Sequence, residues 1–194
     1  MYGTEELNET QKLAVLDTEG AVLITAGAGS GKTRLLTHRI AHLIKDLGVQ
    51  PYNILAITFT NKAAAEMRTR LCSMLDEAEG VWISTFHAAC VRILRRFIDK
   101  IGFDKNFTIY GDQETKAVIK RVCKECDIHD DMQKRVASEI SKAKNKGVSP
   151  EEYASVFKFA QDSDSIAAAY KAYRDALKSN NALDYDDLLI YTLA

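Results

Sequence analysis

The sequence predicts an α/β protein in which a parallel sheet covered by helices is followed by a small all-helical unit. Three short apolar runs, at residues 21–26, 54–59 and 81–84, alternate with segments whose apolar residues recur at helical spacing. Short apolar strands separated by helices are typical of parallel sheets that are buried on both faces. Further along the chain only the short run 107–110 resembles a strand, so we expect a helical unit over roughly 110–183.

The helices of the first part follow from apolar spacing and from residues that begin or end a helix. Residues 32–47 carry apolar side chains at helical intervals, and Gly48 ends the pattern. Residues 63–75 form the next predicted helix, with Asn61 as its N-cap. A third helix is predicted from about residue 87 to residue 101.

The helical unit begins with two further predicted helices. Asp112 is expected to cap a helix that runs to about residue 126, since an aspartate side chain can accept hydrogen bonds from the first N–H groups of a helix. A second helix is expected over about 131–146, and Gly147 ends it.

The rest of the helical unit has a clear start signal at Ser149. Pro150 follows at the first helical position, and Glu152 can close a capping box with the serine. A longer helix is predicted over about 165–178, and the segment after Asp184 is also predicted to be helical.

Composition and charge are those of an ordinary globular protein. The 26 basic residues nearly balance the 27 acidic ones, so bulk charge neither requires nor excludes a nucleic-acid partner. The four cysteines are too few and too scattered for a disulfide framework. The apolar runs are too short to span a bilayer, and the polar, acidic residues 1–20 do not form a signal peptide. We therefore expect a reduced, cytoplasmic protein without a membrane partner.

The strongest chemical signal is the glycine-rich run AGAGSGKT at residues 26–33, between a predicted strand and a predicted helix. Glycines let backbone N–H groups turn inward around a phosphate, and the following helix directs its positive end at the same anion. Lys32 is expected to reach the β- and γ-phosphates of a nucleotide, and the Thr33 hydroxyl to join the shell of Mg²⁺. The strict pattern begins with glycine, where this chain has Ala26. A glycine-rich turn that binds nothing is the alternative.

Four other segments narrow the range of possible functions. They are LNETQ at residues 7–11, ITFTNKAAAEM at 57–67, ISTFHAACVRIL at 83–94 and LDYDDLL at 183–189. Within the first of them, the side-chain amide of Gln11 can both donate to and accept from an adenine base, which suits a residue that reads the base.

Together with the phosphate loop, these segments resemble the N-terminal part of superfamily I DNA helicases of the UvrD/Rep/PcrA type. They match, in chain order, the family's Q motif, motif Ia, motif Ib and the segment that returns from its inserted helical domain. The resemblance implies a RecA-like P-loop NTPase domain 1A over residues 1–109, a helical domain 1B over 110–183, and a return into domain 1A over 184–194.

The resemblance also implies roles for individual residues. Lys32 and Thr33 are the expected catalytic residues, with Thr33 as a ligand of Mg²⁺, and Gln11 contacts adenine. The expected nucleotide-binding residues are Gln11, Ala26, Gly27, Ala28, Gly29, Ser30, Gly31, Lys32, Thr33 and Arg34. The expected single-stranded DNA track consists of Thr58, Phe59, Thr60, Asn61, Thr85, Phe86 and His87. Residues at the carboxyl ends of parallel strands face the ligand crevice, and a phenylalanine there offers a face for base stacking.

The aromatic residues of this track have simpler interpretations. Phe59 ends a predicted buried strand and Phe86 opens an amphipathic helix, so either ring can be part of the core. His87 is more often a hydrogen-bonded polar side chain than a metal ligand or a base.

Two further patterns have simple alternatives to a binding role. Cys123 and Cys126 have the spacing of half a zinc site, but a helical pattern surrounds them and favours two half-buried cysteines. The basic run 134–146 is either a solvated helix face or a contact of the helical domain with the backbone of duplex DNA.

ATP hydrolysis also needs a carboxylate that holds Mg²⁺ and another that activates water. The sequence offers no apolar strand that ends in Asp-Glu. Asp112, after the run 107–110, is better explained as a helix cap, and Asp184, Asp186 and Asp187 follow no predicted strand.

The expected function is therefore that of the N-terminal ATP- and DNA-binding portion of an ATP-dependent DNA helicase or translocase. The resemblance implies ATP and Mg²⁺ as cofactors, single-stranded DNA and a duplex junction as partners, 3′-to-5′ movement, and a role in repair or replication. We expect an N-terminal fragment that hydrolyses ATP poorly by itself. One alternative is a naturally short nucleotide-responsive DNA-binding module. The other is a small P-loop kinase, but a kinase would leave the motifs outside the phosphate loop unexplained.

Overall fold

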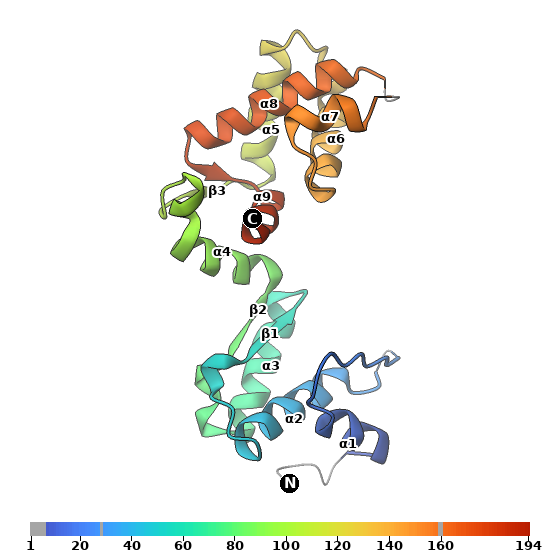
Figure 1. Ribbon diagram of the computed structural model, residues 1–194, viewed down its shortest axis with the longest axis vertical. Coiled ribbons are helices and arrows are strands. Elements are labelled where there is room, and N and C mark those ends of the chain that lie inside the picture. The colour runs from blue at the N-terminus through green and yellow to red at the C-terminus, as the bar shows by residue number, and fades with distance from the viewer. Residues whose placement is uncertain (1–6, 28, 159–160) are drawn as a thin grey trace. The chain divides into compact units, whose positions relative to one another are not determined.

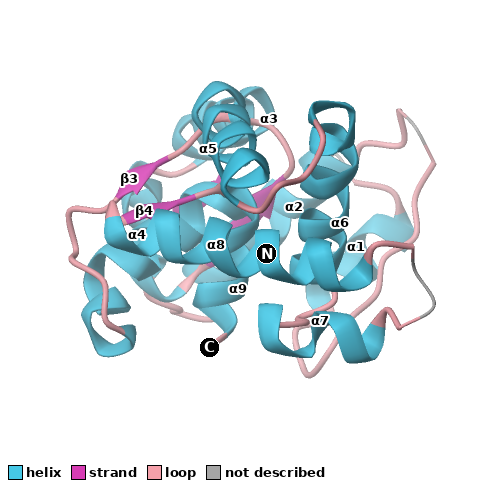
Figure 2. Cartoon of the chain, turned by 90° about the horizontal axis from the view of Figure 1, so that it is seen from above, coloured by secondary structure: helices cyan, strands magenta, loops and turns pink. Residues whose placement is uncertain are grey.

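The computed structural model describes residues 7–27, 29–158 and 161–194. Helices make up most of the described chain, and the strands are short (Figure 2). The chain divides into two compact units, Met1–Phe86 and His87–Ala194, and each is described by itself. Both units contain helices and a small parallel sheet, which confirms a mixed α/β fold.

The first unit contains three helices and a two-stranded parallel sheet in its described part (Figure 1). The helices are α1 (Glu9–Leu16), α2 (Lys32–Lys45) and α3 (Asn61–Met74), and the strands are β1 (Leu55–Thr58) and β2 (Trp82–Thr85). Two 3₁₀ helices, η2 (Pro51–Asn53) and η3 (Asp76–Gly80), connect them. Leu55 pairs with Trp82 and Thr58 with Thr85, so the sequence predicted both strands to within one residue at each end.

The core of this unit lies between α2, α3 and the sheet. Ile40 and Ala41 of α2 pack with Met67 and Leu71 of α3 and with Ile83 of β2. A smaller cluster joins α1 to α2 through Val15 and Leu35. Burial of these side chains holds α1 against the start of α2, where the glycine-rich run ends.

Two predictions for the first unit are wrong. Residues 21–26 form no strand, and the side chain of Leu23 is 89% exposed. A strand needs a neighbour for its backbone hydrogen bonds, and within the described ranges β1 and β2 pair only with each other. The N-cap of α3 is Thr60 rather than Asn61, because the Thr60 hydroxyl accepts a hydrogen bond from the Ala63 N–H at 3.1 Å.

The second unit begins in α4 (Phe86–Phe97) and is mainly helical. The 3₁₀ helix η4 (Ile98–Ile101) follows, then β3 (Thr108–Ile109) and α5 (Asp112–Glu125). Beyond these come η5 (Asp130–Met132), α6 (Gln133–Asn145), α7 (Pro150–Val156), α8 (Ser163–Ser179), β4 (Ala182–Leu183) and α9 (Tyr185–Leu193). The predicted helices are thus confirmed, with the expected shifts of a few residues at their ends.

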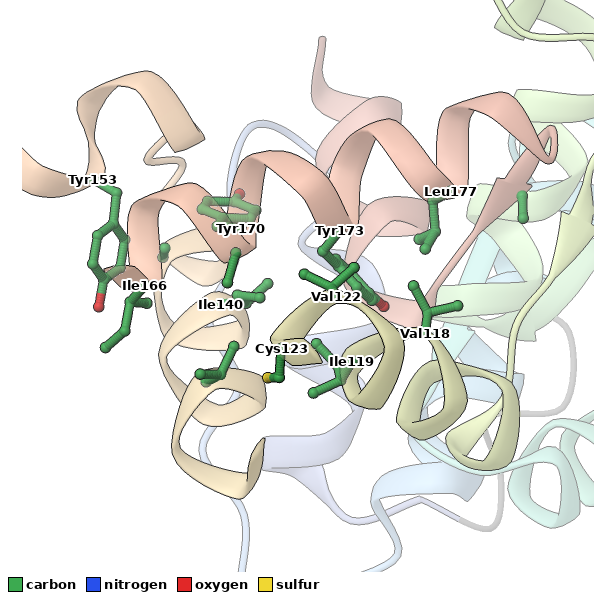
Figure 3. Close-up of a cluster of buried hydrophobic side chains, with 14 residues drawn as sticks. Val118, Ile119, Val122, Cys123, Ile140, Tyr153, Ile166, Tyr170, Tyr173 and Leu177 are labelled. Atoms are coloured by element: carbon green, nitrogen blue, oxygen red, sulfur yellow. The ribbon is translucent and has the colours of Figure 1, made fainter. Parts of the chain in front are cut away.

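The helical core of this unit lies between α5, α6, α7 and α8. Figure 3 shows its side chains converging from these helices, with Cys123 among them. Cys123 is fully buried in this cluster and Cys126 is half-buried, and burial raises the pKa of both thiols. Raised pKa values and apolar surroundings make these cysteines packing residues.

Helix capping in the second unit agrees with the sequence at Ser149 and differs at Asp112. The Ser149 Oγ accepts from the Glu152 N–H at 3.3 Å, Glu152 Oε2 accepts from the Ser149 N–H at 3.1 Å, and Pro150 is the first helical residue. At α5 the N-cap is Gly111, whose N–H donates to Glu114 Oε2 at 3.0 Å. Asp112 is therefore the first helical residue and not the cap.

A second parallel pair of strands, β3 and β4, was not fully predicted. Thr108 pairs with Ala182 and Ile109 with Leu183. The two residues of β4 are too few to show an alternating pattern in the sequence. The acidic segment that begins at Asp184 therefore does follow a strand, contrary to the prediction.

Within the described ranges, none of the helices is both long and apolar enough to cross a membrane.

Candidate nucleotide and nucleic-acid sites

The glycine-rich run forms a loop that leads directly into α2. Gly29 and Gly31 have φ angles of 75° and 86°, in the left-handed region that favours glycine. Gly31 is the N-cap of α2 and supplies no side-chain acceptor to the first N–H groups of the helix. A helix N-terminus with this kind of cap, at the end of a glycine loop, is suited to binding a phosphate. Ala28 lies outside the described residues.

The side chain of Lys32 extends across this loop. Its Nζ donates to the carbonyl oxygens of Ala26 at 3.0 Å and of Gly27 at 2.6 Å. The Ser30 hydroxyl donates to the same Gly27 oxygen at 2.8 Å. Lys32 is exposed rather than packed in the core, so its ammonium group is placed to donate to phosphate oxygens at the loop.

Gln11 joins α1 to the glycine loop. Its Oε1 accepts from the Asn8 N–H at 3.1 Å in the capping box of α1, and its Nε2 donates to the Ser30 carbonyl at 3.2 Å. A cavity of about 300 Å³ lies beside it. The lining residues are Asn8, Thr10, Gln11, Ala14, Ile24, Thr25, Ala26, Ser30, Lys32, Leu35 and Leu36. Gln11 and Lys32 thus share one concave, largely apolar site, although they are far apart in sequence.

The remaining predicted nucleotide residues lie in the first turn of α2. Thr33 and Arg34 follow Lys32 directly, and both are half-buried. The Thr37 hydroxyl donates to the Arg34 carbonyl at 2.8 Å, which is an interaction within the helix. Thr33 therefore lies in the first turn of α2, directly after the loop that Lys32 crosses.

Two aromatic rings lie together where β1 and β2 end. Phe59 follows β1 and is 91% exposed, and Phe86 follows β2 and is 46% exposed. Their ring centroids are 5.7 Å apart with an interplanar angle of 49°. The interpretation of Phe59 as a core residue is therefore wrong, and both rings offer surface to a partner.

Residues with hydroxyl and amide side chains adjoin this pair in the sequence. Thr58 Oγ1 donates to the Thr60 carbonyl at 3.0 Å, while Asn61 is exposed and Thr85 is half-buried at the end of β2. Small polar groups beside an exposed aromatic surface suit a nucleic-acid strand, because they can bond phosphates while bases stack on the rings.

A second aromatic pair occurs in the other unit. The rings of His87 and Tyr185 lie edge to face, with centroids 5.4 Å apart and an interplanar angle of 82°. His87 is exposed, and Tyr185 is 51% exposed. Tyr185 is not among the residues that the sequence predicted to contact DNA. The signal that could have found it is an aromatic residue at the start of an acidic, polar helix turn.

The acidic residues near the end of the chain are engaged within the protein. Lys144 is only 4% exposed, and its Nζ lies 2.7 Å from Asp184 Oδ2 and 2.6 Å from Asp187 Oδ1. The basic run 134–146 is therefore not a uniformly solvated face. Within the same run Arg135 Nη2 donates to the Gln161 carbonyl at 2.7 Å.

Burial and charge set the pKa values of this acidic pair. Burial raises the pKa of Asp187 to about 6, and the nearby Lys144 opposes the shift only in part. Burial acts in the same direction on Asp184, but Lys144 and the hydrogen bonds to that carboxylate outweigh it and lower the pKa. Both carboxylates are paired with the buried ammonium group of Lys144, so they are poorly suited to hold Mg²⁺.

Comparison with known proteins places the chain in a family. The UvrD/REP helicase N-terminal domain matches residues 7–194. The chain belongs to the UvrD/REP helicase family. Relatives of this family include the ATP-dependent DNA helicase PcrA of Leuconostoc citreum, which is 47% identical over 98% of this chain. The PcrA helicases of Staphylococcus epidermidis and Staphylococcus aureus are each 48% identical, over 97% and 96% of the chain.

The chain spans only part of the length of these UvrD/REP relatives. In each of the three, the matched region covers 26% of the relative. The chain therefore corresponds to the N-terminal domain of the family, as the sequence motifs indicated.

Proposed function

We propose that this chain is the nucleotide- and DNA-binding portion of an ATP-dependent DNA helicase or translocase. The observation that carries the proposal is the glycine loop, where Lys32 extends across the turn at the N-terminus of α2 and Gln11 adjoins it. Relatives with about half of their matched residues identical carry the name ATP-dependent DNA helicase, which supports the same function.

In this proposal the loop binds ATP together with Mg²⁺. The backbone N–H groups of the described loop residues would bind the phosphates, Lys32 would donate to the β- and γ-phosphates, and Thr33 would hold the metal. Bound Mg²⁺ neutralises charge that develops on the phosphates. Gln11 lies beside the loop and lines the same cavity, so its amide is available to an adenine base bound there.

The proposed domains follow the family. Residues 1–109 form the first part of a RecA-like domain 1A, residues 110–183 the helical domain 1B, and residues 184–194 the return into domain 1A. The parallel pair β1–β2 supports the first assignment. The helical core, whose buried members run from Val118 to Ala182, supports the second.

Single-stranded DNA is the proposed partner of the two exposed aromatic pairs. Phe59 and Phe86 form one stacking surface in the first unit, and His87 and Tyr185 form another in the second unit. Movement in the 3′-to-5′ direction, action at a duplex junction and a role in repair or replication in the cytoplasm belong to the same proposal, and rest on the family resemblance.

Replacing Phe59 by alanine is expected to weaken binding of single-stranded DNA by about 1–3 kcal/mol, the usual loss for one base–aromatic stack. The thermal midpoint should change little, because the ring is exposed and not packed in the core. Both quantities are measured on the same sample at low, stated salt.

Tyr52→Ala provides the matched control for Phe59→Ala. Tyr52 is an exposed aromatic in the same unit but lies in η2, which precedes β1, and not at the carboxyl ends of the strands. It should leave DNA affinity unchanged. A fall in midpoint that corresponds to the stability loss of a buried phenylalanine, about 3–5 kcal/mol, would show that Phe59 is a core residue and that the DNA contact is misassigned.

The 194-residue chain is expected to bind ATP weakly and to hydrolyse it negligibly. Its sequence holds no apolar strand ending in Asp-Glu, and Asp184 and Asp187 are already paired with Lys144. Steady-state phosphate release in the presence of Mg²⁺ and single-stranded DNA tests this. Turnover near the enzyme median of about 10 per second would contradict the proposal.

A further inference from the structure

Side chains of α6 and α8 contact the carboxylates of Asp184 and Asp187 at the start of α9. Lys144 of α6 contacts Asp184 Oδ2 and Asp187 Oδ1, and the Tyr173 hydroxyl of α8 donates to Asp184 Oδ2 at 2.8 Å. The other two oxygens close the capping box, with Asp187 N–H to Asp184 Oδ1 at 2.8 Å and Asp184 N–H to Asp187 Oδ2 at 3.2 Å. Every carboxylate oxygen of this pair is therefore engaged.

The third aspartate of the turn is also held from α6. Ser141 Oγ donates to Asp186 Oδ2 at 2.7 Å. Three of the side chains of residues 184–187 thus point to α6 or α8, and that of Tyr185 lies exposed against His87. Tyr173, whose ring centroid lies 5.1 Å from Lys144 Nζ, is part of the helical core (Figure 3).

We propose that Lys144 is a positioning residue for nucleic-acid binding, because it holds Asp184 and Asp187 and thereby fixes the ring of Tyr185 beside His87 as a stacking surface. This inference rests on the proposed function, since it takes Tyr185 and His87 to contact single-stranded DNA.

The physical reason is preorganisation. A helix N-terminus is prone to fray, and a ring on a mobile first turn loses conformational freedom when a base stacks on it. Lys144 restricts the turn before DNA binds, because its buried ammonium group on α6 holds Asp184 and Asp187, which lie on either side of Tyr185 in the chain. Less conformational freedom is then lost when a base stacks on the ring. Its aliphatic stem and its ammonium group are both within the protein, so it cannot itself contact DNA.

The test compares Lys144→Met with Lys142→Met. Lys142 lies on the same helix, is exposed and pairs with Glu139, so its removal changes the net charge equally without touching α9. The chain has four histidines, and the imidazole proton signals of His87 are assigned by comparison with His87→Gln. The Tyr185 ring should shift these signals by its ring current.

Lys144→Met is expected to abolish the ring-current shift of His87 and to weaken oligo-dT binding about tenfold, the loss of one stack. Lys142→Met should do neither. In a Tyr185→Ala background, Lys144→Met should cause no further loss of affinity. An equal loss in both backgrounds would overturn the proposal, because Lys144 would then act on the fold as a whole.

A second variant covers the case in which Lys144→Met does not fold. Lys144→Met/Asp187→Leu removes the buried pair together and leaves Asp184 with the Tyr173 hydroxyl, so it should fold. A folded variant that keeps the His87 shift and the wild-type DNA affinity would overturn the positioning role. A different outcome is that Lys144→Met loses the His87 shift while Tyr185→Ala binds DNA with wild-type affinity. That outcome would contradict the DNA contact of Tyr185 and would support the positioning of its ring by Lys144.

Discussion

Replacing Lys32 by alanine is expected to weaken ATP binding by about 10- to 100-fold, the range for losing hydrogen bonds from a charged donor to phosphate. The fold should remain, because Lys32 is exposed and its Nζ donates to the carbonyl oxygens of its own loop rather than packing in the core. A nucleotide titration measures the first effect, and circular dichroism with a thermal midpoint measures the second.

Lys62→Ala is the matched control for Lys32→Ala. Lys62 is exposed on α3 and lies within 4.0 Å of Glu66, so its removal changes the charge of the same unit away from the loop. It should leave ATP affinity unchanged. A collapse of the helical signal in Lys32→Ala would show that the lysine is structural, and unchanged affinity would remove it from the phosphate site.

Lys144→Met is expected to destabilise the chain by about 3–5 kcal/mol, the usual effect of removing one partner from a buried ion pair. The reason is that Asp184 and Asp187 remain in a low-dielectric site after their cation is lost. Urea unfolding followed by circular dichroism measures the free energy of unfolding.

Two comparisons separate this effect from a general loss of charge. Lys142→Met should cost less than about 1 kcal/mol, because exposed ion pairs contribute little. Lys144→Met/Asp187→Leu should recover part of the lost stability, since one of the two carboxylates that lose their cation is removed with it and Asp184 keeps the Tyr173 hydroxyl. Equal losses for Lys142→Met and Lys144→Met would mean that the buried cluster contributes nothing specific.

Much of the fold could be predicted from local patterns. The runs at 54–59 and 81–84 became β1 and β2, and most helices were placed to within a few residues. Helix caps shifted by one residue at Thr60 and Gly111, because neighbouring residues can also supply the cap and only the backbone geometry decides between them. The run 21–26 failed as a strand because apolar character does not supply a pairing partner.

The candidate sites also contain some residues that local sequence patterns predicted and others that only the fold brings together. The glycine loop and Phe59 are visible in the sequence because they are short, contiguous motifs. The contact of Gln11 with Ser30 and that of Tyr185 with His87 join residues far apart in the chain. Lys144 looked like one member of a basic run, and only the packing of α6 against α9 shows that its charge is buried.

The central claim is that residues 26–33 bind the phosphates of a nucleotide. The most direct test is amide NMR of the chain during titration with Mg²⁺ and ADP. The claim predicts that the largest shift changes occur at the N–H groups of the loop and the first turn of α2, with a change at the Gln11 side-chain amide. Saturation of the chain with nucleotide without changes at the loop would contradict it. So would the absence of binding at about 1 mM ADP, a concentration that corresponds to a binding free energy of about −4 kcal/mol.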